Sequence, residues 1–118
     1  MENTEKLIKL TASDGTVVLI YTLSLPQELT PRAAAFYSDI AEAFERSVRE
    51  RFHMSALRAY RECPDRRKRY RYSPWHALFR VEACDQGVVL NITANGESLR
   101  REKHLWRDDV LIKRVKLN

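Results

Sequence analysis

Hydrophobic and polar positions follow two kinds of period along the chain. Period-two alternation over residues 6–11 and 16–25, around the Asp14-Gly15 step, predicts a β-hairpin. Apolar positions then recur every three or four residues from Thr30 to about Tyr60, which predicts a single long amphipathic helix. Period two returns in four short segments that turn residues separate: Trp75 to Cys84, Val88 to Ala94, Ser98 to Trp106 and Val110 to Leu117.

The predicted element order is therefore β-β-α-β-β-β-β, an α+β fold with one long helix on one face of a mostly antiparallel sheet. Residues 16–25 are apolar on both faces, so we expect a central strand. Residues 98–106 and 110–117 carry charge on both faces, which is typical of edge strands protected against aggregation. The alternation leaves open whether the first strand pairs with the second alone or also lies beside the last.

Local signals place the helix start and one tight turn. Thr30 is expected to cap free backbone N–H groups, and Pro31 fits the first helical position because it has no N–H to satisfy. Asn95-Gly96 predicts a type I′ turn, which needs positive φ at both central residues. The apolar stripe of the helix consists of Phe36, Tyr37, Ile40, Phe44, Val48 and Phe52.

Length and composition predict a single domain over residues 1–118. A hydrophobic content of 44% is typical of a globular chain. The sequence contains no apolar run of about 18 residues and opens on polar residues, so we expect no membrane span, no signal peptide and a cytoplasmic location. Cys63 and Cys84 lack metal-ligand spacing and are expected to be free thiols.

Charge is distributed unevenly between the two halves. Residues 1–57 hold 6 basic and 8 acidic residues, whereas residues 58–118 hold 15 and 8. The excess is greatest in the connector 58–75, where aromatic residues stand between the basic ones. This pattern suggests a single-stranded nucleic-acid site. A solvated loop is the favoured alternative, because no known nucleic-acid-binding motif accompanies the charge. The candidate polyanion-binding residues are Arg61, Arg66, Arg67, Lys68, Arg69, Tyr70 and Arg71.

No motif in the chain indicates catalysis. Phosphate-binding, nucleophile-elbow and zinc-protease signatures are absent from the sequence, so we expect no enzyme activity, no catalytic residues, no metal and no cofactor. His53, His76 and His104 are scattered, and packing explains the shared strand face of His104 and Trp106. Glu82 and Glu102 are candidate neighbours across strands, although two carboxylates on a sheet are commonly just solvated.

A resemblance adds one further expectation. Residues 56–113 contain Leu57-Arg58-Ala59-Tyr60, a basic stretch from Asp65 to Tyr72, Pro74-Trp75 and His104-Leu105-Trp106. This pattern resembles small uncharacterised clostridial proteins, which in turn look related to the domain of unknown function found in lysozyme-sensing anti-sigma factors of bacilli. The resemblance implies a helix packed on an antiparallel sheet, and it carries over no active residue.

Three functions follow as hypotheses. The first is a non-enzymatic regulatory or protein-binding domain of a bacterium, with a protein partner or a second copy of the chain bound at the helix end and the exposed sheet edge. Its candidate residues are Met54, Leu57 and Tyr60, because the apolar stripe drifts there. The second is nucleic-acid binding through the connector. The third is an enzyme or carrier with a small-molecule pocket between helix and sheet.

Overall fold

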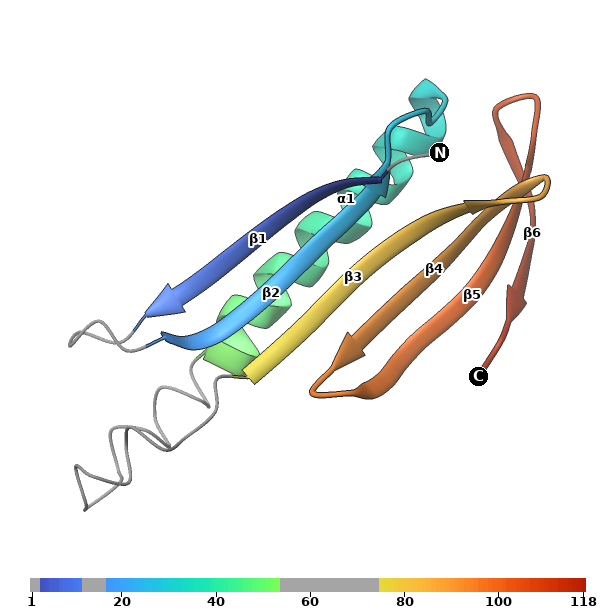
Figure 1. Ribbon diagram of the computed structural model, residues 1–118. Coiled ribbons are helices and arrows are strands. Elements are labelled where there is room, and N and C mark those ends of the chain that lie inside the picture. The colour runs from blue at the N-terminus through green and yellow to red at the C-terminus, as the bar shows by residue number, and fades with distance from the viewer. Residues whose placement is uncertain (1–2, 12–16, 54–74) are drawn as a thin grey trace, which may run out of the picture.

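The computed structural model describes residues 3–11, 17–53 and 75–118, which form a helix packed on one sheet (Figure 1). The helix α1 (Pro31–Ser47) continues into a π-helical segment, η1 (Val48–His53). The α+β class and the element order are confirmed. The six strands are β1 (Asn3–Thr11), β2 (Val17–Pro26), β3 (Trp75–Cys84), β4 (Gly87–Ala94), β5 (Glu97–Arg107) and β6 (Val110–Lys116).

The sheet is mixed, which corrects the sequence-based picture of its strand arrangement. Its order is β1-β2-β3-β4-β5-β6, and every neighbouring pair is antiparallel except β2 and β3. These two strands run parallel, with Leu19 opposite Trp75 and Ser24 opposite Arg80. A parallel pair needs a long crossover, and α1 supplies one by running back along the sheet behind β2 and β3 (Figure 1).

The hydrophobic core lies between α1 and one face of the sheet. Tyr37 of α1 is completely buried, as are Leu19 and Tyr21 of β2 and Phe79 of β3. Phe79 and Tyr37 belong to the same cluster, so this face of β3 packs against the helix. Phe44 packs against both parts of this core, one around β3 and β4 and the other around β2. Val81 and Leu90 complete the fully buried apolar set on the central strands.

The helix boundaries differ in part from those predicted. Thr30 occupies the N-cap position, but its side chain makes no capping hydrogen bond; instead its carbonyl oxygen accepts one from the Ala34 N–H at 2.8 Å. Regular α-helix ends at Ser47, where the wider η1 segment begins with the fully buried Val48. Residues 54–60, expected to continue the helix, lie outside the described residues.

The last two strands correct two further expectations. β5 is an interior strand between β4 and β6, so only β6 is an edge at this side of the sheet. Glu102 is opposite the buried Leu90, whereas Glu82 is opposite Val89, so the two carboxylates point to opposite faces of the sheet. Asn95 and Gly96 have φ of 50° and 80°, which confirms positive φ at both central residues of the predicted turn.

Candidate binding groove and sheet edge

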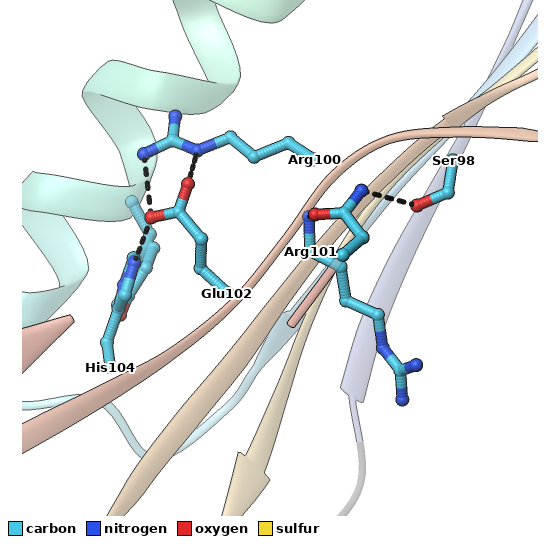
Figure 2. Close-up of polar contacts among 7 residues, drawn as sticks. Ser98, Arg100, Arg101, Glu102 and His104 are labelled. Carbon is cyan, nitrogen blue, oxygen red and sulfur yellow. Dashed lines mark hydrogen bonds and ion pairs between the residues drawn. The ribbon is translucent and has the colours of Figure 1, made fainter. Parts of the chain in front are cut away.

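A chain of polar side chains crosses the interface between α1 and β5. The Trp106 Nε1–H donates to the Tyr37 hydroxyl oxygen at 3.0 Å, and that hydroxyl lies 2.7 Å from His104 Nδ1. His104 Nε2 is 3.0 Å from Glu102 Oε1, and Arg100 donates to both oxygens of the same carboxylate (Figure 2). These five residues, from Trp106 to Arg100, are called the polar network below.

The hydrogen bonds of the polar network have one consistent direction. The Arg100 guanidinium, together with His104, lowers the pKa of Glu102 to about 2, so the carboxylate is ionised and can only accept. His104 Nε2–H therefore donates to it, and in the tautomer that carries this hydrogen Nδ1 accepts the Tyr37 O–H. Burial raises the pKa of Tyr37 to about 12, so the hydroxyl keeps its proton at neutral pH. Each of these polar groups thus has a partner inside the network.

Aromatic packing fixes the polar network to the helix. The Tyr37 and His104 rings stack with centroids 5.7 Å apart, and Phe36 makes edge contacts with Tyr37, His104 and Trp106. The Arg114 guanidinium of β6 lies over the Phe36 ring, 5.3 Å from the ring centroid. These edge-to-face and cation–π contacts hold β5 and β6 in place against α1.

A groove adjoins the Arg100 end of the polar network. It has a volume of about 710 Å³ and lies between the second half of α1 and the β4–β5 hairpin. Arg100 belongs to both, because it lines the groove and bonds Glu102. The apolar lining is Ile40, Ala43, Phe44, Val48, Ile92, Ala94 and Leu99, and the polar lining is Ser47, Asn95, Glu97 and Arg100.

The edge strand β6 is a second exposed feature. Its sequence, VLIKRVK, contains three cationic residues and no acidic one. Val110 and Ile112 are 48% and 51% exposed, although both are large apolar residues. Ile112 also lies where the β5–β6 register shifts, between Leu111 and Lys113, so it has no direct partner on β5.

None of the residues that the sequence singled out for a site is among those that the structure describes. Met54, Leu57 and Tyr60 lie outside the described residues, as do all seven candidate polyanion-binding residues of the connector, so both hypotheses stay predictions. Sequence analysis also missed Tyr37, Glu102 and Arg100 as members of one network. A signal was present, because Arg100, Glu102 and His104 alternate along a predicted strand and therefore share one face.

Comparisons with known proteins add no assignment. No protein-family model, no curated protein and no solved structure matches this chain. The resemblance to the lysozyme-sensing family therefore stays a prediction. In the described parts of the chain, no three His, Cys, Asp or Glu side chains are grouped so that they could hold a metal ion, and no helix is long and apolar enough to cross a membrane.

Proposed function

We propose that this chain is a non-enzymatic protein-binding domain, and that its groove receives an apolar segment of a partner protein. The observation that carries this proposal is the make-up of the groove, in which an apolar floor from α1, β4 and β5 meets a polar rim. Protein interfaces have the same arrangement, with an apolar centre that supplies most of the affinity and polar groups around it.

The polar network supports binding rather than catalysis. A nucleophile needs a neighbouring base that is free to take its proton, and the Tyr37 hydroxyl does lie beside His104. However, Tyr37 and His104 are both completely buried, and the raised pKa of Tyr37 opposes loss of its proton. The network therefore acts as a fixed support for Arg100 at the rim of the groove.

Arg100 supplies a hydrogen-bond donor at the rim of the groove. Its Nε and Nη2 donate to Glu102, whereas Nη1 has no partner among the described residues and is directed away from Glu102 (Figure 2). Nη1 can donate to a backbone carbonyl of the partner, and Asn95 and Glu97 can accept from its N–H groups. Because Glu102 balances the charge of Arg100, the rim suits an uncharged polypeptide backbone beside an apolar side chain.

Selection from a random-peptide display library on the whole protein tests this proposal. We expect the selected peptides to share an apolar anchor, and their affinity, measured by fluorescence anisotropy, to fall more than about tenfold for Leu99→Asp, as loss of an interface anchor does. Leu99 is 51% exposed, so the substitution leaves the core intact.

Leu7→Asp is the matched control, since Leu7 on β1 is 59% exposed and is not among the groove residues. It should leave the affinity unchanged. Failure to select any peptide, or an equal loss of affinity in both variants, would contradict a groove that binds protein.

A further inference from the structure

β6 offers a second binding surface, separate from the groove. Among the described strands it is the last of the sheet and has a neighbour on one side only, so the backbone N–H and C=O groups along its other side have no strand partner there and can pair. Edge lysines alone discourage such pairing. β6 instead combines Lys113, Arg114 and Lys116 with Val110 and Ile112, two apolar side chains that are each about half exposed.

The edge is held in a fixed conformation before any partner arrives. Arg114 is anchored over the Phe36 ring of α1. Beyond β6, the Leu117 N–H donates to the Arg101 carbonyl oxygen at 2.8 Å, and the Asn118 side chain donates to Ser98 Oγ at 3.2 Å (Figure 2). A pre-ordered strand loses little conformational entropy when a second strand pairs with it, which favours binding.

We propose that β6 binds an extended, acidic segment of a partner protein, which adds to the sheet as a seventh strand. Backbone hydrogen bonds to the open side of β6 would supply affinity, as in other cases of β-strand addition. Apolar residues of the segment would cover Val110 and Ile112. Acidic residues would face Lys113 and Lys116, so charge would select the partner.

Charge also argues against a second copy of this chain as the occupant. Two antiparallel β6 strands would bring three cations of one copy against three of the other, with no acidic residue on either strand. The other edge of the sheet, β1, is no better, because it carries Lys6 and Lys9 against a single acid, Glu5. Like charges placed opposite each other across a strand pair are destabilising. An acidic partner removes this repulsion.

Fluorescence anisotropy with a defined peptide tests the proposal. The probe is a labelled peptide in which pairs of glutamates alternate with pairs of valines, so that each face of the extended strand carries both, as Lys113 and Lys116 on opposite faces of β6 require. It is titrated with the whole protein at low and moderate salt. We expect saturable binding that weakens with salt, and a loss of affinity of at least about fivefold for Lys113→Glu. A peptide of the same sequence with an N-methyl group on every backbone nitrogen should not bind, because neither of its edges can donate hydrogen bonds to β6.

The matched control is Lys9→Glu. Lys9 and Lys113 are both exposed, and both lie on edge strands on the sheet face opposite α1, so the two substitutions make the same change of charge at opposite edges. Equal weakening by both variants would show that only net charge matters and would overturn the proposal. No binding at low salt would overturn it as well, as would full binding of the N-methylated peptide.

Two further titrations separate this proposal from its alternatives. Leu99→Asp should leave binding of the acidic peptide unchanged, so failure of the groove and failure of the edge can be told apart. A single-stranded oligonucleotide should bind Lys113→Glu and Lys9→Glu equally. If the oligonucleotide instead binds in a Lys113-dependent way and the peptide does not bind, β6 is a nucleic-acid surface and the protein partner is excluded.

Discussion

The Tyr37 hydroxyl serves two neighbours at once, because it accepts from the N–H of the partly buried Trp106 and donates to Nδ1 of the fully buried His104. Tyr37→Phe removes that single oxygen and leaves both nitrogens without a partner. Since a buried polar group without a hydrogen bond costs about 1–3 kcal/mol, we expect the free energy of unfolding to fall by about 2 kcal/mol or more. Urea unfolding followed by circular dichroism measures the loss.

Tyr21→Phe is the appropriate comparison. Tyr21 is also completely buried as a residue, but its hydroxyl donates to Glu45 at 2.8 Å, and the Glu45 side chain is 26% exposed, so water can solvate it when the hydroxyl is removed. The expected loss is about 1 kcal/mol. If Tyr37→Phe were no more destabilising than Tyr21→Phe, the polar network would not be a unit.

Glu102 makes the stability depend on pH in the acid range. Its pKa is about 2 in the folded protein and near 4.5 otherwise, so the unfolded chain binds this proton more readily. The stabilisation, about 3 kcal/mol, is therefore complete above pH 4.5 and is lost as the pH falls from 4.5 towards 2. We expect Glu102→Gln to be less stable than the wild type at pH 7, and the difference to vanish near pH 2. A constant difference across that range would contradict the assigned role of the carboxylate.

Glu102 also shows that the face on which a strand residue lies could not be predicted from the sequence. Its alternation with Arg100 and His104 could be read from the sequence, and it predicted a shared face. The sequence did not show which face this was, because β5 carries charge on both sides, and the expected pairing with Glu82 was wrong. The side that holds Glu102 is set by the register with β4, a contact between segments that only the folded sheet defines.

For helices, strands and turns, the sequence predicted those features that depend only on nearby residues. The helix start at Pro31, the Asn95-Gly96 turn and the limits of β3 all depend on residues within a few positions, and all appear in the structure. The parallel pairing of β2 with β3 depends on how α1 crosses the sheet. Periodicity contains no information on that path, so this part of the fold could not be predicted.

Gly87 shows how closely β4 and β5 approach each other. A Cβ atom at this position would lie 2.0 Å from the His104 carbonyl oxygen, a backbone atom that can move only with its strand. We expect Gly87→Ala to lower the free energy of unfolding by about 3 kcal/mol, at the upper end of what overpacking costs. Chemical denaturation measures the change.

Gly96→Ala provides the control within the same pair of strands. Nothing lies within 4 Å of a Cβ atom at Gly96, whose φ of 80° nevertheless strains an alanine. The expected loss is about 1 kcal/mol. Equal losses for the two substitutions would mean that the close approach of β4 and β5 at Gly87 does not affect the free energy of unfolding.

For the whole molecule, one-sided coverage of the sheet predicts a gradient of stability across its strands. α1 buries residues of β2, β3 and β4, whereas β1 and β6 each have a single neighbouring strand. Hydrogen exchange followed by NMR should find the slowest amides in β3 and β4 and faster exchange in β6. Amides of β6 protected as strongly as those of β4 in the isolated protein would contradict an open edge.

The parallel contact between β2 and β3 also bears on how the protein folds. β3 to β6 form a meander of adjacent hairpins, which can assemble from contacts between near neighbours in the chain. Leu19 can pair with Trp75 only after the chain has closed a loop that includes all of α1. Loop closure of this length slows folding, so the parallel β2–β3 pair should form last and set the folding rate. The β1–β2 hairpin would then dock onto a meander that already exists.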